Sequence, residues 1–179
     1  MNRIPAAVRK KAEVIKLLLL DVDGVLTDGA IIVNDRGVET KHFHVRDGQG
    51  IALLVMAGVQ VGLITGRSSK AVGLRAQELG IKLVYQGRRN KLHAYEAIKK
   101  KTGLSDAEIA YVGDDIVDLP VLARSGLAVA VADSWSGLRT KVDYVTRQPG
   151  GKGAVREVCE LLLRAQGRYA SLAQTRGTR

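Results

Sequence analysis

Two carboxylates follow a short apolar run near the start of the chain. Asp21 and Asp23 come directly after the four leucines of residues 17–20, and Asp114 follows another apolar run much later. A carboxylate can attack phosphorus and form an aspartyl phosphate, and a second carboxylate can exchange a proton with the leaving oxygen. Residues of this type and spacing suit phosphoryl-transfer chemistry.

Two further segments supply groups that bind phosphate. Thr65 lies in Ile-Thr-Gly-Arg, and Lys91 follows Gly-Arg-Arg-Asn. A hydroxyl donor and a point charge both stabilise phosphoryl oxygens. Because carboxylates repel a phosphate unless a cation lies between them, the set also predicts Mg²⁺, which prefers oxygen ligands.

The elements that must position these groups alternate along the chain. Strands are predicted at Lys16–Leu20, Gln60–Ile64, Lys82–Tyr85, Ile109–Val112, Leu127–Val131 and Asp143–Thr146. Helices are predicted at 6–14 and near 48–57, 68–79, 90–102, 115–124, 135–141 and 153–166. Strands that alternate with helices predict an α/β fold with a mainly parallel sheet and helices on both faces. Ligands bind at the carboxyl ends of such strands, where the polar residues lie.

One segment interrupts this alternation. Residues 29–44 contain two extended runs around Asn-Asp-Arg-Gly, which predicts a projecting β-hairpin. Ala30 to Val33 are apolar at consecutive positions, so both faces of the first strand would be apolar. A hairpin cannot bury both faces alone, and we therefore expect a subunit interface there.

The composition is that of one folded domain over residues 1–179. Apolar residues make up 46% and charged residues 26%, and no apolar run is long enough for membrane insertion. The single cysteine, Cys159, has no internal disulfide partner, which suits a reducing cytoplasm.

The net charge of +10 is concentrated at the ends of the chain. Residues 1–16 carry five basic side chains and one acidic one, and residues 161–179 carry four basic and no acidic ones. We interpret the basic ends, at about 1–15 and 167–179, as solubilising tails. They alone would support a nucleic-acid partner, and we predict none.

The motifs resemble the haloacid dehalogenase superfamily. Asp-Val-Asp-Gly-Val-Leu-Thr-Asp-Gly, Ile-Thr-Gly-Arg, Asn-Lys and Tyr-Val-Gly-Asp-Asp occur in the order of that superfamily. Val-Arg-Asp-Gly, Tyr-Gln-Gly and Gly-Gly-Lys-Gly-Ala-Val-Arg-Glu extend the resemblance, over roughly residues 16–165, to the 3-deoxy-D-manno-octulosonate 8-phosphate phosphatase family. The resemblance implies a Rossmann-like fold of the capless haloacid dehalogenase type, a homotetramer with central hairpins, and a small anionic sugar phosphate as substrate.

The resemblance also implies roles for individual residues. Asp21 is then the nucleophile, Asp23 the general acid and base, and Thr65 and Lys91 the ligands of the phosphoryl oxygens. Mg²⁺ is expected on Asp21, on the backbone carbonyl of Asp23 and on Asp114. Two alternatives stay open for Asp115 and Asp118: either they cap the following helix, or one of them holds a metal-bound water.

Further substrate contacts are carried over from the same family. In addition to Asp23 and Lys91, they are His44, Val45, Arg46, Asp47, Gly48, Arg67, Arg75 and Lys152. Lys152 would act at a neighbouring subunit's site, where relatives often have arginine. Ala52 stands where some relatives have a basic residue, so that contact is not predicted.

Two rival functions differ in class. A related phosphatase acts on a nine-carbon sialic-type sugar acid, and its motifs barely differ. The same fold also serves as a non-catalytic oligomerising module attached to sugar nucleotidyltransferases, but the intact set Asp21, Asp23, Lys91 and Asp114 argues against it.

Overall fold

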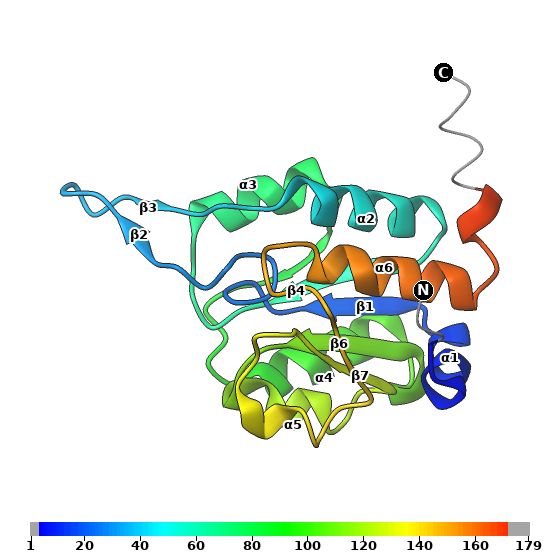
Figure 1. Cartoon of the computed structure of the whole chain (residues 1–179). Helices are drawn as coiled ribbons and strands as arrows, with labels where there is room; N and C mark the ends of the chain where they lie inside the picture. Colours follow the sequence, from blue (N-terminus) through cyan, green and yellow to red (C-terminus); the bar gives the residue numbers. More distant parts are fainter. Residues whose placement is uncertain (1–3, 172–179) are drawn as a thin grey trace.

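The computed structural model describes residues 4–171 and is built on one six-stranded parallel sheet (Figure 1). The strand order is β5-β4-β1-β6-β7-β8, and every neighbouring pair is parallel. Their bounds are β1 Leu17–Leu20, β4 Gln60–Ile64, β5 Leu83–Tyr85, β6 Ile109–Gly113, β7 Leu127–Ala130 and β8 Tyr144–Val145. The six strands predicted from the apolar runs are confirmed. The arrangement is an α/β fold with a parallel sheet, as the sequence predicts.

Helices cover both faces of this sheet (Figure 1). One face packs against α1 Ala6–Glu13, α2 Val45–Met56, α3 Lys70–Glu78 and α6 Ala154–Ala165. The other face packs against α4 Lys91–Thr102 and α5 Leu119–Leu122. Leu18 and Leu20 of β1 lie in the first core, and Leu17 and Leu19 lie in the second. Since successive side chains of a strand point to opposite faces, a continuous leucine run fits a strand buried on both sides.

Two predicted helices are shorter than expected. The segment predicted at 115–124 is a 3₁₀ turn, Ile116–Asp118, followed by the single turn of α5. Pro120 is the second residue of α5, in the first helical turn, where proline is tolerated because the missing N–H would have no partner within the helix. The segment predicted at 135–141 contains only the 3₁₀ turn Ser136–Leu138, and a third 3₁₀ turn spans Asp106–Glu108.

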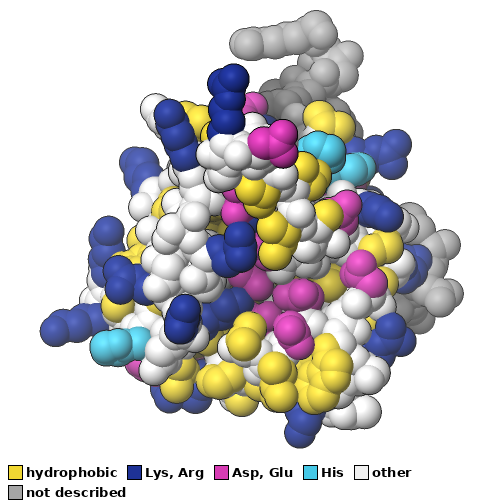
Figure 2. All heavy atoms as spheres, turned by 90° about the vertical axis from the view of Figure 1, so that its left-hand side faces the viewer, with side chains coloured by type: hydrophobic (Ala, Val, Ile, Leu, Met, Phe, Trp, Pro, Cys, Tyr) yellow, Lys and Arg dark blue, Asp and Glu magenta, His cyan; other side chains and the backbone are white. Residues whose placement is uncertain are grey.

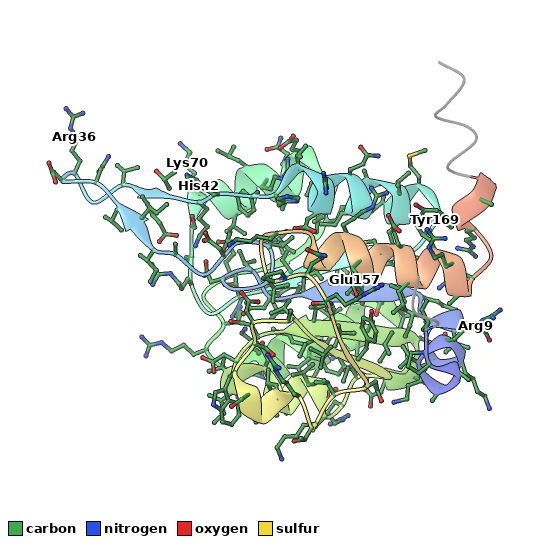
Figure 3. The ribbon with its side chains drawn as sticks, viewed as in Figure 1. Arg9, Arg36, His42, Lys70, Glu157 and Tyr169 are labelled. Atoms are coloured by element: carbon green, nitrogen blue, oxygen red, sulfur yellow. The ribbon has the colours of Figure 1, made fainter. Side chains whose placement is uncertain are left out.

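The predicted hairpin is present and projects from the body (Figure 1). Its strands are β2 Ile32–Val33 and β3 Glu39–Thr40. The Asn34 side chain accepts hydrogen bonds from the backbone N–H groups of Arg36 and Val38, which closes the turn. Arg36 at the tip points away from the rest of the molecule (Figure 3).

The basic N-terminal segment is a packed helix rather than a loose tail. Val8 and Ala12 of α1 are buried in the same core as α6, while Arg9 faces outward and pairs with Glu13 (Figure 3). The outermost parts of both predicted tails, residues 1–3 and 172–179, lie outside the described residues. Among residues 4–171, no helix has the length and apolarity to cross a membrane.

Candidate active site

The polar residues predicted to converge do meet at the carboxyl ends of three neighbouring strands. Leu20, the last residue of β1, pairs with Leu63 of β4 and with Val112 of β6. The residues that follow these strands therefore lie side by side at one edge of the sheet. Figure 2 shows this side of the molecule: acidic side chains gather at its centre, and lysine and arginine side chains surround them.

Lys91 joins two buried carboxylates. It is the first residue of α4, and its Nζ lies 2.8 Å from Asp21 Oδ2 and 2.7 Å from Asp118 Oδ1. Asn90 precedes it and caps the helix by accepting a hydrogen bond from His93 N–H. Burial alone would lower the pKa of Lys91, but the two carboxylates outweigh burial and raise it. Lys91 is thus a fixed cation beside Asp21.

Asp118 is fully buried and accepts from four donors. Its Oδ1 receives the Tyr111 hydroxyl at 2.6 Å and Lys91, and its Oδ2 receives the backbone N–H groups of Asp114 and Asp115. Asp118 therefore holds the loop that carries Asp114. Sequence reasoning missed Tyr111, although its position in a buried strand seven residues before Asp118 was a usable signal.

Asp115 caps the 3₁₀ turn that follows it. Its carboxylate accepts a hydrogen bond from Ile116 N–H at 2.7 Å. Of the two alternatives left open for Asp115 and Asp118, the structure thus provides a hydrogen-bonding role within the protein for both side chains.

Asp114 has the opposite character, because its carboxylate accepts no hydrogen bond from any residue within 4–171. It packs against Gly24, where a Cβ would lie 2.1 Å from Asp114 Oδ2. Gly24 also has a φ of +88°, so both its conformation and this contact require glycine. Burial, followed by the charges of Asp21 and Asp118, raises the pKa of Asp114 to about 8.

The cluster has the chemistry of a cation site. Carboxylate oxygens of Asp21, Asp114 and Asp118 lie within 4.8 Å of one another. Burial raises the pKa of Asp21 to about 6 even though Lys91 lowers it, and the Asp118 charge adds to the rise. Buried carboxylates that repel one another fit a hard divalent cation such as Mg²⁺. Since Asp118 is occupied by four donors, Asp21 and Asp114 are the carboxylates left for it.

Thr65 lies one residue beyond β4 and is buried. Its backbone pairs with Tyr85 and Arg88 on the neighbouring segment, and its hydroxyl oxygen accepts a hydrogen bond from Arg67 N–H at 3.3 Å. The hydroxyl hydrogen is left to donate to a ligand at this edge.

Asp23 lies between Arg67, which the sequence analysis predicted at the site, and Lys41, which it missed. Its carboxylate contacts Lys41 and lies 3.9 Å from Arg67 Nε, and both cations also pair with Glu39. Glu39 lies in β3 and Lys41 follows this strand, so the hairpin returns to the sheet edge at this point. The only sequence signal for the Glu39–Lys41 pair was the alternating Glu-Thr-Lys, which places the two charged side chains on the same side of a strand.

The predicted substrate loop begins α2 and divides into exposed and buried residues. Val45 and Arg46 are exposed, whereas Asp47 is buried. Asp47 accepts hydrogen bonds from Gly153 N–H at 3.2 Å and from Arg156 N–H at 2.7 Å, so it caps the start of α6. His44 Nδ1 lies 3.9 Å from Asp47 Oδ2.

The other predicted substrate residues have diverse surroundings. Arg75 pairs with Glu78 at 2.7 Å and lies against Gly48, where a Cβ would be 2.1 Å from its guanidinium. Arg67 lies beside Asp23, as described above. Lys152 is exposed, and no hydrogen bond or ion pair of its side chain is present among residues 4–171.

The segment before α6 packs directly on the loop after the nucleophile candidate. Gly151 N–H donates to Val25 carbonyl at 2.9 Å, and Gly150 N–H donates to Asp133 at 2.9 Å. Gly151 has a φ of +62°, and its Cβ would lie 2.4 Å from the Thr27 backbone. Lys152 is thus presented from a backbone that is anchored on both sides.

Comparisons with known proteins show the family to which the chain belongs. A family model for haloacid dehalogenase-like hydrolases matches residues 84–157. A 3-deoxy-D-manno-octulosonate 8-phosphate phosphatase from Escherichia coli (strain K12) is 51% identical over 165 residues, which cover 92% of this chain and 88% of the relative.

Solved structures give the same result. The structure of 3-deoxy-D-manno-octulosonate 8-phosphate phosphatase from Yersinia pestis matches with a TM-score of 0.91 and 47% identity, covering 92% of this chain and 89% of that one. The structure of the enzyme from Moraxella catarrhalis, solved with magnesium ion, phosphate ion and KDO, matches with a TM-score of 0.92 and 45% identity. The match covers 94% of this chain and 97% of that one. The chain belongs to the haloacid dehalogenase-like hydrolases, in the family of the 3-deoxy-D-manno-octulosonate 8-phosphate phosphatases.

Proposed function

We propose that this protein is a Mg²⁺-dependent phosphatase that hydrolyses 3-deoxy-D-manno-octulosonate 8-phosphate to the free sugar acid and phosphate, in lipopolysaccharide precursor synthesis. The observation that carries the proposal is the placement of Lys91 against Asp21, with Asp114 beside them at the same sheet edge. A nucleophile, a phosphate-binding cation and a metal ligand are thereby brought together. The relatives described above carry this activity in their names.

In the first half of the reaction, Asp21 attacks phosphorus in line with the sugar oxygen. Lys91 holds Asp21 Oδ2, so we assign the attack to Oδ1. The new Asp21–phosphorus bond forms as the phosphorus–sugar oxygen bond breaks, and Asp23 gives its proton to the departing oxygen. Thr65 and Lys91 bind phosphoryl oxygens throughout.

In the second half, Asp23 works as a base. It takes a proton from a water molecule, whose oxygen bonds to phosphorus while the Asp21–phosphorus bond breaks. Inorganic phosphate leaves, Asp21 is again a carboxylate and Asp23 is again protonated. Mg²⁺ held by Asp21, Asp114 and the backbone carbonyl of Asp23 would neutralise charge on the phosphoryl group when bound.

The substrate must be closed in by parts outside the sheet edge, because within residues 4–171 a two-stranded hairpin is the only insertion after β1. We infer a homotetramer in the cytoplasm, in which the hairpins pack together. The tetramer is supported by exposed apolar side chains on the hairpin, namely Ile31, Ile32, Val33 and Val38. The cytoplasmic location is supported by Cys159, which is buried and forms no disulfide. In such an assembly, Lys152 of one subunit would reach a neighbour's substrate.

We propose that the remaining substrate contacts lie around this edge. They are His44, Val45, Arg46, Asp47, Gly48, Arg67 and Arg75. For Asp47, the bonds to the start of α6 support a role in shaping the loop rather than direct contact with the sugar acid. Arg67 and the exposed Arg46 are the stronger candidates for binding a carboxylate.

A phosphate-release assay over a panel of sugar phosphates tests the proposal. With Mg²⁺ present, kcat/KM should be highest on 3-deoxy-D-manno-octulosonate 8-phosphate. A higher value on a nine-carbon sialic-type acid phosphate would assign the protein to that substrate instead. Absence of phosphate release from every sugar phosphate would favour the oligomerising module.

A further inference from the structure

Asp23 and three other charged side chains, Lys41, Glu39 and Arg67, form a closed ring of ion pairs. Asp23 Oδ1 contacts Lys41 Nζ, and Lys41 Nζ lies 2.7 Å from Glu39 Oε1. Glu39 Oε2 lies 2.7 Å from Arg67 NH2, and Arg67 Nε lies 3.9 Å from Asp23 Oδ2. Each carboxylate therefore uses one oxygen for each cation, and the ring has no net charge.

Lys41 is the most deeply placed member of this ring. Its side chain is 2% exposed, compared with 46% for Arg67. A buried ammonium is costly unless it is paired and hydrogen-bonded. Burial would lower the pKa of Lys41, but its hydrogen bond to Asp23 and its ion pair with Glu39 raise it, so the side chain stays charged between the two carboxylates.

We propose, on the basis of the phosphatase function above, that Lys41 and Glu39 are positioning residues for Asp23. Lys41 fixes Oδ1 of Asp23, and Glu39 keeps Lys41 and Arg67 in place. The less tightly held oxygen, Oδ2, then exchanges the proton with the sugar oxygen and with water. A carboxylate that is free to rotate would present this oxygen in the reactive geometry less often.

The ring gives the hairpin a second task besides packing. Glu39 pairs with Val33 across the hairpin, and Lys41 is the second residue after it. The base of the hairpin is thereby tied to Asp23, while its apolar strand lies farther out (Figure 1). The position of the hairpin and the orientation of the Asp23 carboxylate are therefore coupled within one chain.

Kinetics on two substrates test this proposal. Lys41→Met preserves the length of the side chain but removes its charge, and Glu39→Gln preserves the shape while removing the charge that holds Lys41. On 3-deoxy-D-manno-octulosonate 8-phosphate, which has a poor leaving group, we expect kcat to fall about 10-fold or more for Lys41→Met and less for Glu39→Gln, with KM within about twofold of wild type. On p-nitrophenyl phosphate, whose leaving group needs little protonation, kcat should fall less than threefold, by the same reasoning.

Lys100→Met is the matched control, because Lys100 is an exposed helix lysine far along α4. It should behave as wild type on both substrates. A rise in KM on the sugar phosphate with unchanged kcat would overturn the proposal and make Lys41 a substrate ligand. Equal kcat losses on both substrates, or wild-type kcat in both variants, would also overturn it.

Folding and function are separated by the same set. Light scattering and circular dichroism identify a variant that does not fold, and Glu39→Gln, whose side chain remains the same size, then decides the question through its kcat ratio between the two substrates. Failure of the proposed function is distinct, since wild-type protein would then not hydrolyse the sugar phosphate at all.

Discussion

Lys91 and Asp118 form a fully buried ion pair, with Lys91 Nζ 2.7 Å from Asp118 Oδ1, directly beside Asp21. The pair links the first residue of α4 to the 3₁₀ turn after β6. Two loops that are far apart in the sequence are thus held together under the nucleophile. Asp118 also receives Tyr111 and two backbone N–H groups, so it organises the site although we assign it no contact with phosphate.

We predict that Asp118→Asn lowers both stability and activity. The amide cannot accept hydrogen bonds from all four donors, and the buried Lys91 loses one of its two carboxylate partners. The free energy of unfolding should therefore fall by about 2–4 kcal/mol. Phosphate release should fall at least about 10-fold, because Lys91 and Asp114 lose their fixed positions. Thermal unfolding and steady-state kinetics measure these effects.

Tyr111→Phe is the control for this prediction. It removes one hydroxyl from the same carboxylate and leaves the charge pair intact, so it should cost only about 1–2 kcal/mol. If Asp118→Asn were as stable and as active as Tyr111→Phe, the organising role of Asp118 would be wrong.

Asp21→Asn should abolish phosphate release while the fold remains intact. Asparagine is nearly isosteric with aspartate but cannot attack phosphorus effectively. Removing one carboxylate relieves repulsion in the cluster but also takes one partner from Lys91, so the thermal stability should change less than for Asp118→Asn. Phosphate release measured on highly purified protein checks the first expectation, and activity near wild type would remove Asp21 from its role.

Asp23→Asn should depend on the leaving group. Hydrolysis of the sugar phosphate should fall by about 100-fold or more, whereas an activated aryl phosphate needs less protonation and should be affected less. Comparison of kcat on the two substrates measures the difference. Equal losses would count against Asp23 as general acid.

Much of this site could be predicted from the sequence, because its core is written as short motifs at strand ends. Asp21, Thr65 and Asp114 each follow an apolar run, and parallel pairing brings such positions together. Lys41, Glu39 and Tyr111 could not be found in this way. Their roles depend on where a hairpin folds back and on which face of β6 a tyrosine occupies, so the weak local signals, an alternating Glu-Thr-Lys and a tyrosine in a buried strand, were not sufficient.

The apolar spacing also failed to predict the length of the helices after β6 and β7. Apolar spacing over 115–124 is compatible with a continuous helix, but the Asp118 side chain binds the backbone of Asp114 and Asp115 and tightens the turn. Side-chain capping outweighed periodicity there. Asp47 shows the same limit, since its partners lie more than a hundred residues away.

The raised pKa values predict how metal and pH act together on stability. In the folded protein the pKa of Asp114 is raised from 3.8 to about 8 and that of Asp21 from 3.8 to about 6. Between pH 3.8 and about 8, these two groups therefore bind more protons in the folded state than in the unfolded chain. Their contribution to the free energy of unfolding must decrease as pH rises through this window.

Mg²⁺ should reverse that loss. At pH 8 it has few protons to displace, so it should raise the melting temperature more at pH 8 than at pH 5.5, by about 5 °C or more when in large excess. Thermal unfolding with MgCl₂ or EDTA at both pH values measures this. Asp114→Asn should eliminate most of the difference; an equal Mg²⁺ effect at both pH values would show that the cation binds elsewhere.

We predict that charged substitutions on the hairpin change the oligomeric state. Ile31 and Ile32 are 60% and 41% exposed in the single chain, so Ile31→Glu or Ile32→Glu should not disturb the fold. If these residues pack between subunits, a buried unpaired charge there would cost several kcal/mol, and light scattering should show smaller species. Val14→Glu places the same charge on a 52% exposed valine away from the hairpin and should preserve the wild-type mass. A wild-type monomer at micromolar concentration would exclude the tetramer.

We propose that Lys152 connects assembly to catalysis, and its own chain anchors the backbone that presents it. The N–H groups of Gly150 and Gly151 donate hydrogen bonds to Asp133 and to the Val25 carbonyl, respectively. The N–H group of Gly153 donates a hydrogen bond to Asp47. Lys152→Ala should therefore leave fold and oligomer unchanged, and should lower kcat/KM on the sugar phosphate about 10-fold while sparing a small aryl phosphate. The reason is that a charge reaching a neighbour's site can contact only a substrate large enough to meet it.

Subunit mixing then distinguishes a neighbour's Lys152 from a residue acting on its own site. Hybrids of Lys152→Ala with Asp21→Asn contain sites that pair an intact nucleophile with a neighbour's intact Lys152, so activity on the sugar phosphate should rise above the sum of the two parent preparations. Exchange of subunits is verified first by mass spectrometry of differently tagged chains. Gln148, which lies on the same segment, supplies a matched variant: Gln148→Ala should need no rescue. If verified hybrids gain nothing and Lys152→Ala alone is fully active, Lys152 is an ordinary surface lysine.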